Sequence, residues 1–324
     1  MPDWLIATGP LSVGVIMLIL GGDLLVRGAA ALAARLGISP LIIGLTVVAF
    51  GTSAPELALN VSAALKGNTD LSFGNIIGSN IANVGLILGL SCLVRPMLVH
   101  SALLRREIPV MLIASGATIA LALLPPHAGG APGFSRLDGA LFLAGFLAFL
   151  ELMRRGAKAG RSELLAEAPP EERPQAAWVA IGLVIGGLAL LAVGGNLAER
   201  GAVGVARAIG LSDAVIGLTV VAVATSLPEL ATSVMAARRN QIDIAVGNVV
   251  GSNIFNLLLV LGVSTLIAPT PSPEGGLRAL IVMMGLALLL VPLSRTHNGT
   301  ISRAEGALLL AIWIGALAYE VAAS

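Results

Sequence analysis

The sequence predicts an all-α membrane protein of ten transmembrane helices, arranged as two inverted repeats of five helices each. Three observations predict this fold class. Of the 324 residues, 56% are hydrophobic and only 11% are charged, whereas a soluble domain carries about 25% charged residues. Apolar stretches of about twenty residues, the length needed to cross a bilayer, alternate with short polar breaks. A long segment of the first half also recurs in the second half.

The apolar stretches predict the individual helices. We expect them near residues 5–33, 38–65, 71–94, 107–124, 137–153, 176–206, 211–236, 243–268, 277–294 and 304–321. The polar segment 154–175, which contains three prolines, separates five stretches from five. We therefore predict a first five-helix repeat at 1–153, a cytoplasmic linker at 154–175 and a second, inverted five-helix repeat at 176–324. The linker is too short to fold as a domain of its own.

The basic residues predict which side of the membrane each loop faces. If the N-terminus lies outside, 14 of the 19 Lys and Arg residues fall in inside-facing loops and 5 in outside-facing loops. Cytoplasmic loops are enriched in Lys and Arg. We therefore expect a multi-pass protein of the cytoplasmic (inner) membrane with both termini outside.

Composition also limits the partners. A net charge of +1 gives no long-range field that would attract nucleic acid. The single cysteine, Cys92, cannot form an internal disulfide. We expect the lipid bilayer as the surroundings and no nucleic-acid partner, and the sequence indicates no obligatory protein partner.

The repeat is long and has no gaps. Ile38–Gly89 aligns with Leu211–Gly262 at a constant offset of 173, with 28 of 52 positions identical. The match extends backwards to the pairs Gly21-Gly22 and Gly194-Gly195. Because each repeat has an odd number of apolar stretches, the second repeat enters the membrane from the opposite side. Inverted repeats are typical of secondary transporters, whose binding site lies at the membrane midplane where the repeats meet.

The first polar motif places a glutamate inside an apolar stretch of each repeat. It reads Gly-Thr-Ser-Ala-Pro-Glu at 51–56 and Ala-Thr-Ser-Leu-Pro-Glu at 224–229. A carboxylate at this depth is costly, so it normally faces the bundle interior and has a partner. Proline lacks a backbone donor, which frees carbonyls near Gly51 and Ala224 to face an ion. A proline kink with a protonated glutamate is the purely structural alternative, and recurrence in both repeats argues against it.

The second polar motif combines glycine, serine and asparagine. It occupies residues 74–83 and 247–256. Within each copy a serine and an asparagine are four residues apart and share one helical face; these pairs are Ser79 with Asn83, and Ser252 with Asn256. The glycines allow close helix packing, and packing alone is an adequate explanation for them. The remaining amides are candidates for a structural role: Asn75, Asn80, Asn248 and Asn253.

The two motifs together predict a ring of oxygen ligands. Carboxylates, hydroxyls and amide carbonyls come from both repeats: Glu56, Glu229, Thr52, Thr225, Ser53, Ser226, Ser79, Ser252, Asn83 and Asn256. The absence of His and Cys from these segments argues against zinc, copper and iron. Ca²⁺ takes 6–8 oxygen ligands, and two carboxylates balance one divalent cation. They would serve monovalent cations at overlapping positions equally well, and ions that need the same carboxylates exchange for one another.

The two motif pairs resemble the signature repeats of the cation/calcium exchanger superfamily, in particular the small prokaryotic sodium/calcium antiporters. The resemblance implies that Glu56 and Glu229 are the central carboxylates for Ca²⁺ and Na⁺. It implies backbone oxygen ligands for Ca²⁺ from Thr52 and Thr225. It implies flanking Na⁺ ligands from Ser53, Ser79, Ser226 and Ser252, and a middle-site ligand from Asn83. The second-half counterpart of Asn83 is often Asp in this family and is Asn256 here, which leaves stoichiometry and K⁺ dependence open.

The resemblance implies a sodium/calcium exchanger-like fold and an antiporter that exchanges Ca²⁺ for Na⁺ by alternating access. The first and sixth helices would slide past the helices that carry the two motifs. The pairs Gly21-Gly22 and Gly194-Gly195 would leave no side chain in the way of this movement. An H⁺- or K⁺-linked exchanger, a cation channel and an intramembrane enzyme are the alternatives. All three histidines fall in predicted loops, which argues against an enzyme. We expect no enzymatic activity and no cofactor, only Ca²⁺ and Na⁺ as transported ions.

Overall fold

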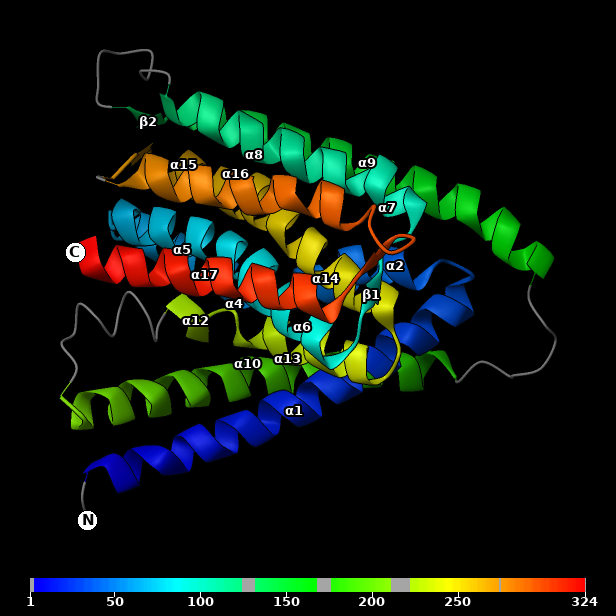
Figure 1. Ribbon diagram of the computed structural model, residues 1–324, viewed down its shortest axis with the longest axis horizontal. Coiled ribbons are helices and arrows are strands. Elements are labelled where there is room, and N and C mark those ends of the chain that lie inside the picture. The colour runs from blue at the N-terminus through cyan, green and yellow to red at the C-terminus, as the bar shows by residue number, and fades with distance from the viewer. Residues whose placement is uncertain (1–2, 124–131, 168–175, 211–221, 274, 324) are drawn as a thin grey trace.

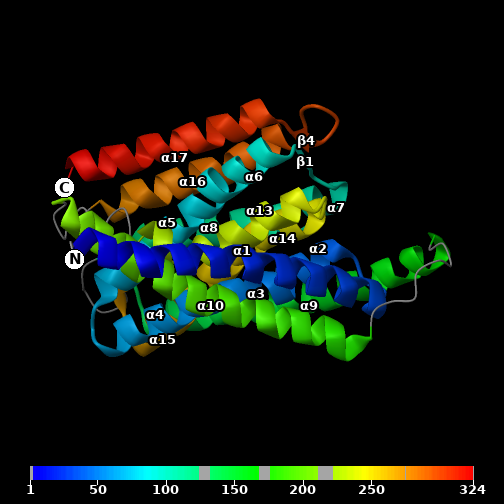
Figure 2. The ribbon, with the colours of Figure 1, turned by 90° about the horizontal axis from the view of Figure 1, so that it is seen from below.

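The computed structural model describes residues 3–123, 132–167, 176–210, 222–273 and 275–323. Almost all of these residues are helical. The long helices run roughly along one common direction, and helix α1 begins at the same end of the molecule at which helix α17 ends (Figures 1 and 2). Two very short sheets accompany the helices.

The first half contains one unbroken helix, two interrupted helices and two further long helices. In chain order these are α1 (Asp3–Leu36); α2 (Pro40–Ile43), η1 (Gly44–Val48), α3 (Ala49–Thr52) and α4 (Ala54–Leu65); α5 (Thr69–Ala82), η2 (Asn83–Leu88) and α6 (Gly89–Val94); α7 (Ser101–Arg105) and α8 (Glu107–Leu123); and α9 (Arg136–Glu167). The segments labelled η are π-helical, a form that occurs mostly as short stretches at functional sites.

The second half repeats this order. It contains α10 (Ala177–Ala208); α12 (Ala222–Ala224) and α13 (Leu227–Arg238); α14 (Ile242–Phe255), η4 (Asn256–Val260) and α15 (Leu261–Ile267); α16 (Gly276–Leu293); and α17 (Arg303–Ala323). Residues 211–221, in which the seventh predicted stretch begins, lie outside the described residues.

Six helical segments in the described ranges are long and apolar enough to cross a membrane. They are Ala7–Leu36, Thr69–Val94, Leu103–Leu123, Ala177–Ala208, Ile242–Ile267 and Gly276–Leu293. The pair Pro40–Thr52 and Ala54–Leu65, bent by 44°, is a seventh if it counts as one span. The architecture is therefore all-helical and membrane-like, and the crossing of all ten predicted stretches stays a prediction.

Helix α9 is longer than the sequence analysis predicted. We expected it to end near residue 153, but it continues through Glu167, so residues 154–167 of the predicted linker are helical. Glu151 accepts hydrogen bonds from Arg154 (2.6 Å) and Arg155 (2.7 Å). Such pairs three and four residues apart favour the helical conformation. The rest of the predicted linker, 168–175, lies outside the described residues.

Helices α1 and α10 lie side by side (Figures 1 and 2) and touch through glycines spaced seven residues apart. A Cβ added at Gly14 would lie 2.6 Å from the carbonyl oxygen of Gly194, and one at Gly187 would lie 2.8 Å from that of Gly21. Small residues are what allow two backbones to approach this closely in a membrane. The two helices are antiparallel, because lower-numbered residues of one contact higher-numbered residues of the other.

Helices α1 and α10 both pack against α13. A Cβ at Gly22 of α1 would lie 3.0 Å from the carbonyl oxygen of Ala231, and one at Gly195 of α10 would lie 3.5 Å from the Pro228 side chain. Asp23 of α1 also forms an ion pair with Arg239, directly after α13. The residue of α4 that corresponds to Ala231 in the repeat is Ala58, and it is exposed. The two halves are therefore packed differently at this point.

Two-stranded sheets join the halves. Strand β1 (Met97–Leu98) pairs antiparallel with β4 (Thr300–Ile301), and β2 (Gly133–Phe134) pairs antiparallel with β3 (Thr270–Pro271). Each sheet takes one strand from each half. The two sheets lie at opposite ends of the molecule (Figures 1 and 2).

The last helix of each half begins with the same local structure. Residues 135–141 and 302–308 both read Ser-Arg-x-acid-Gly-Ala-Leu. The backbone N–H of Ser135 donates to Asp138 (2.7 Å), and that of Ser302 donates to Glu305 (2.7 Å). These are capping boxes, which satisfy backbone donors at the start of a helix. The offset between these copies is 167 and not 173, so they lie outside the ungapped repeat described above.

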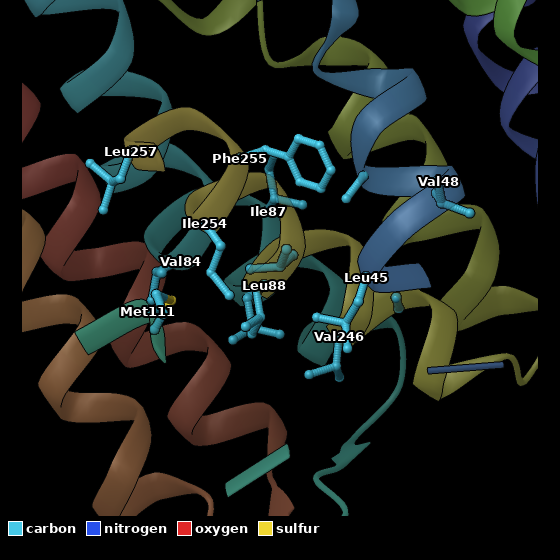
Figure 3. Packing of buried hydrophobic residues seen from close by; sticks show 14 of the residues in the cluster. Leu45, Val48, Val84, Ile87, Leu88, Met111, Val246, Ile254, Phe255 and Leu257 are labelled. Atoms are coloured by element: carbon cyan, nitrogen blue, oxygen red, sulfur yellow. The ribbon is translucent and has the colours of Figure 1, made fainter. Parts of the chain in front are cut away.

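Helix α14 lies in the centre of the molecule. All residues from Ile244 to Leu258 are buried, as expected for a helix surrounded on every side by other helices. Figure 3 shows the apolar packing around it, with Leu45 and Val48 of η1, Ile87 of η2 and Met111 of α8. This packing holds the two interrupted segments of the first half against the centre of the second half.

Candidate ion-binding site

The first motif forms a break within a helix in each half. Helix α3 ends at Thr52 and α4 begins at Ala54, with Ser53 between them at φ −84° and ψ 2°. Ser226 takes the same conformation, φ −92° and ψ 7°, between α12 and α13. A proline follows within the first turn of α4 and of α13. Because proline has no N–H to donate, the helix is interrupted here and a carboxylate follows directly after each break.

The two glutamates meet in the interior. Glu56 is 2% exposed and Glu229 is 1% exposed. Their carboxyl groups lie close enough to interact with each other. The Ser53 hydroxyl donates a hydrogen bond to Oε1 of Glu229 (3.0 Å). In the described part of the chain neither glutamate has a basic partner, so no protein cation balances a charged carboxylate at this position.

The asparagines of the second motif lie where the π-helical segments begin. Asn83 is the first residue of η2, and Asn256 is the first residue of η4. Both are buried, at 1% exposure each. Asn83 donates from Nδ2 to Oδ1 of Asn253 (2.9 Å), which leaves its own carbonyl oxygen available. The serine one turn earlier in each copy is also buried.

Seven side-chain oxygens of the predicted ligands are buried without a hydrogen-bond partner among the described residues. They are Oε2 of Glu56 and Glu229, Oγ of Ser79, Ser226 and Ser252, and Oδ1 of Asn83 and Asn256. A buried polar atom with no partner costs about 1–3 kcal/mol. Eight other buried side-chain oxygens in the described ranges also lack a partner, among them Oε2 of Glu107 and Oγ of Ser91. It is therefore the two carboxylates at corresponding positions of both halves, rather than the number of such atoms, that points to a cation. Hard oxygen ligands of this kind match Na⁺ and Ca²⁺.

The three other predicted ligands have partners. Ser53 donates to Glu229, as described above. The Thr52 hydroxyl donates to Oδ1 of Asn248 (3.1 Å), and the Thr225 hydroxyl accepts from Nδ2 of Asn75 (3.1 Å). These two bonds cross between the halves and occupy the hydroxyl groups. Which atom of each threonine would bind an ion stays a prediction.

Sequence reasoning missed the residues that hold the bridging amides. Asn60 donates from Nδ2 to Oδ1 of Asn75 (2.7 Å), and Asn248 donates from Nδ2 to Oγ of Ser233 (2.9 Å). Asn60 and Ser233 correspond in the repeat. The signal that would have found them is a polar residue at the same position of both apolar stretches, one turn after the glutamate.

Nothing in the described ranges resembles a transition-metal site. No cluster of three or more His, Cys, Asp or Glu side chains suited to holding a metal ion occurs there. The arrangement is instead two carboxylates within a set of neutral oxygen atoms. Oxygen ligands of this kind suit hard cations such as Na⁺ and Ca²⁺ better than transition metals.

Comparison with known proteins identifies the family. The family model described as sodium/calcium exchanger protein matches residues 6–154 and again residues 179–322. The chain belongs to the sodium/calcium exchanger family. As a member of this family, with several apolar helices, the exchanger is a multi-pass membrane protein, and cation/Ca²⁺ exchange is the class of activity that its relatives support.

Individual relatives match over the full length. The exchanger is 41% identical over 320 residues to the putative antiporter CaxA of Alkalimonas amylolytica, with 96% of this chain and 97% of that protein covered. It is 38% identical over 327 residues to the inner membrane protein YrbG of Escherichia coli (strain K12), with 97% of each covered. The solved structure of the sodium-calcium exchanger NCX_Mj, soaked with Na⁺ and Sr²⁺, superposes with a TM-score of 0.83 at 33% identity and covers 97% of this chain and 98% of that chain.

Proposed function

We propose that the protein is a secondary active antiporter that exchanges Ca²⁺ for Na⁺ across the cytoplasmic membrane by alternating access. The observation that carries the proposal is the buried pair Glu56 and Glu229, which has no basic partner in the described part of the chain and in which each carboxyl group has one oxygen without a hydrogen-bond partner. The transported cation itself supplies the missing countercharge. Ca²⁺ and Na⁺ need the same two carboxylates, so one leaves when the other binds.

The proposed architecture is ten membrane spans in two inverted repeats. The glycine contacts of α1 and α10 support it, because they keep the same form when each residue is exchanged with its counterpart 173 positions away. Gly14 meets Gly194, and their counterparts Gly187 and Gly21 meet each other. The sheets support it as well, since each joins the two halves and the two lie at opposite ends (Figure 1). An inverted repeat places the shared site at the midplane.

The proposed orientation has both chain ends outside. Its support is the excess of basic residues in the loops at the end of the molecule opposite to the termini. Arg95, Arg105, Arg238, Arg295 and Arg303 all lie at that end, where α6 and α13 end and α17 begins. We call this the inner end, and the end with the chain termini the outer end.

We propose that alternating access is a movement of the α1–α10 pair relative to the core helices, which are the helices that carry the two motifs (α4, α5, α13 and α14). The pair now covers α13 through Gly22, whereas the corresponding face of α4 is exposed at Ala54 and Ala58. In the opposite state of the transporter, α10 would cover α4, and α13 would be exposed. Exchange of one packing for the other changes which side of the site is covered, while the oxygen ligands stay on the core helices.

The test is ⁴⁵Ca²⁺ uptake into proteoliposomes loaded in turn with Na⁺, with K⁺, or with a pH gradient. We expect uptake that saturates with Ca²⁺ and requires internal Na⁺. If only K⁺ or only a pH gradient drives uptake, the coupling ion is K⁺ or H⁺ and not Na⁺. Flux that does not saturate and needs no counter-ion would contradict antiport and indicate a channel.

A further inference from the structure

A cavity at the inner end is lined by arginines. It is an open depression with a volume of about 490 Å³ between the end of α6, the end of α13 and the start of α17, and two of its arginines, Arg95 and Arg238, are exposed. Its lining residues are Val94, Arg95, Pro96, Ala237, Arg238 and Arg303. The cavity is separate from the ion site, since none of the predicted ion ligands lines it.

One of the three arginines has a structural role. Arg303 donates from Nε to the carbonyl oxygen of Leu93 (3.0 Å) and from Nη2 to that of Val94 (3.3 Å). Its counterpart in the other half, Arg136, likewise donates to the carbonyl oxygen of Ile267 (3.4 Å). The fold uses this arginine in both halves to bind the last carbonyls of a helix, which complements the helix dipole.

The other two arginines have no such explanation. Neither Arg95 nor Arg238 makes a side-chain hydrogen bond or ion pair with a residue that the structure describes. The positions corresponding to them at the outer end are Ala268 and Leu65. The repeat therefore does not require a basic residue at either place.

No acidic side chain lines the cavity. Glu305, the acid closest to Arg303 along the chain, accepts hydrogen bonds from Ser302 (2.7 Å) and Thr296 (2.6 Å). Asp23 forms an ion pair with Arg239 instead. Three positive charges thus line one concave surface and are not neutralised there by a carboxylate.

The surroundings of the cavity are apolar on one side. Val94 is 39% exposed and Leu93 is 36% exposed, both at the end of a helix in a membrane protein. An exposed apolar edge beside a cluster of arginines is the chemistry of the boundary between acyl chains and headgroups. Basic pockets between membrane helices on the cytoplasmic side bind anionic headgroups.

We propose that this cavity binds the phosphate headgroup of an anionic phospholipid in the inner leaflet. Arg95 and Arg238 contact the phosphate oxygens, Arg303 closes the third side, and an acyl chain lies along Leu93 and Val94. Arginine suits this role because its planar fork donates two hydrogen bonds to one phosphate group. The choice of leaflet rests on the orientation proposed above, whereas binding itself does not depend on it or on the transport reaction.

The test is binding of phosphatidylglycerol to the full-length protein in detergent, followed by native mass spectrometry. Three proteins are compared: wild type, the double variant Arg95→Gln with Arg238→Gln, and a control, Arg105→Gln with Arg295→Gln. The control removes two exposed arginines from the same end of the molecule, outside the cavity. Phosphatidylcholine serves as the zwitterionic comparison. Thermal unfolding of each protein verifies that it is folded.

We expect wild type and control to bind one phosphatidylglycerol more tightly than phosphatidylcholine. The double variant should bind it about thirtyfold more weakly, because an arginine near an anionic lipid surface contributes a factor of about five. Wild-type affinity in the double variant, or an equal loss in the control, would overturn the proposal. If an equal concentration of glycerol phosphate displaces the lipid, the ligand of the cavity is a soluble phosphate, and the proposal of a lipid ligand is overturned. None of these outcomes bears on Ca²⁺/Na⁺ exchange, which the proteoliposome experiment tests separately.

Discussion

Glu56 and Glu229 are buried together without a basic partner in the described part of the chain, and in the proposed function the transported cation supplies their countercharge. The sequence was sufficient to find them, because a carboxylate in an apolar stretch is costly and here occurs at corresponding positions of both halves. It was not sufficient to predict what the threonines do. Their hydroxyl groups bond to Asn75 and Asn248 across the two halves, and a contact of this kind depends on packing that no local pattern encodes.

Replacing either glutamate by its amide should abolish Ca²⁺ transport while the protein still folds. Glu56→Gln or Glu229→Gln removes one of the two charges that balance Ca²⁺. Removing one partner of a buried charge arrangement costs about 3–5 kcal/mol, so Ca²⁺ affinity should fall by about a hundredfold or more, which abolishes uptake at the Ca²⁺ concentrations that the wild type transports. The measurement is Na⁺-driven ⁴⁵Ca²⁺ uptake in proteoliposomes. Glu151→Gln, which changes an exposed carboxylate, is the control; a near wild-type rate in either site variant would rule out the shared site.

Asn256 distinguishes this chain from the family pattern, in which an acid is common at that position. Asn256→Asp should be tolerated by the fold, since the two side chains are nearly the same size. At high pH the added charge should change cation preference or K⁺ sensitivity. At low pH the variant should behave like wild type, because burial favours the neutral form of a carboxylic acid. Flux measured from about pH 5.5 to 9 tests this; identical profiles would mean that Asn256 does not face the ions.

Among the helices, the sequence predicted positions better than ends. The apolar stretches coincide with helices throughout the described ranges, since hydrophobic length is a strong signal for a membrane helix. The predicted end of α9 near residue 153 is wrong by fourteen residues, since the helix continues to Glu167. The charged residues that end the apolar stretch pair along the helix and do not begin a loop. The π-helical segments that begin at Asn83 and Asn256 have no sequence signature and could not be predicted.

The contact between α1 and α10 should tolerate no added methyl group at its glycines. A Cβ at Gly187 would lie 2.6 Å from the backbone nitrogen of Leu25, whereas one at Gly182 on the same helix meets nothing within 4 Å. Overpacking typically costs about 1–3 kcal/mol. Gly187→Ala should therefore lower the unfolding temperature in detergent and slow Ca²⁺ uptake, and Gly182→Ala should do neither. Equal behaviour of the two variants would contradict the close packing.

At the scale of the whole molecule, the inverted symmetry that the sequence repeat indicates stays a prediction, and the repeat gave no information on how the two halves pack together. Each half ends with a helix that docks on the other half: a Cβ at Gly139 of α9 would lie 2.8 Å from the carbonyl oxygen of Gly262, and one at Gly306 of α17 would lie 2.8 Å from that of Gly89. The domain boundaries at 1–153 and 176–324 stay a prediction from the chain order. They describe sequence units, whereas the packing mixes both halves around α14.

The proposed orientation is open to a labelling experiment in intact cells. In a Cys92→Ser background, Ser162→Cys in the extension of α9 should resist an impermeant thiol reagent until the cells are permeabilised. Lys66→Cys, exposed between α4 and α5, should be labelled at once, because it lies at the opposite end of the molecule. The reverse pattern would invert the topology.

The packing of α1 on α13 predicts how the two states of the exchanger are populated. The ion pair Asp23–Arg239 holds α1 against α13, and Ala58 on α4 is exposed. Asp23→Asn should favour the state in which α10 covers α4. Because an exposed ion pair is worth up to about 1 kcal/mol, thiol labelling of Ala58→Cys should slow by up to about fivefold. Asp70→Asn, at an exposed position in the first turn of α5, is the control, and unchanged labelling in Asp23→Asn would remove the ion pair from this role.

The ion pair has no equivalent in the other half, where the corresponding residues are Asn196 and Lys66. In the proposed cycle, the two end states therefore differ in energy even when the same ions are bound and no gradient is applied. Such a difference cannot decide which way Ca²⁺ flows, because the ion gradients alone fix the direction of net transport. In the proposed cycle it decides in which of its two states the ion-loaded carrier spends more time, and hence which compartment the site faces more often. As salt screens exposed charges, that balance between the two states should shift with ionic strength, although the stoichiometry of exchange would not.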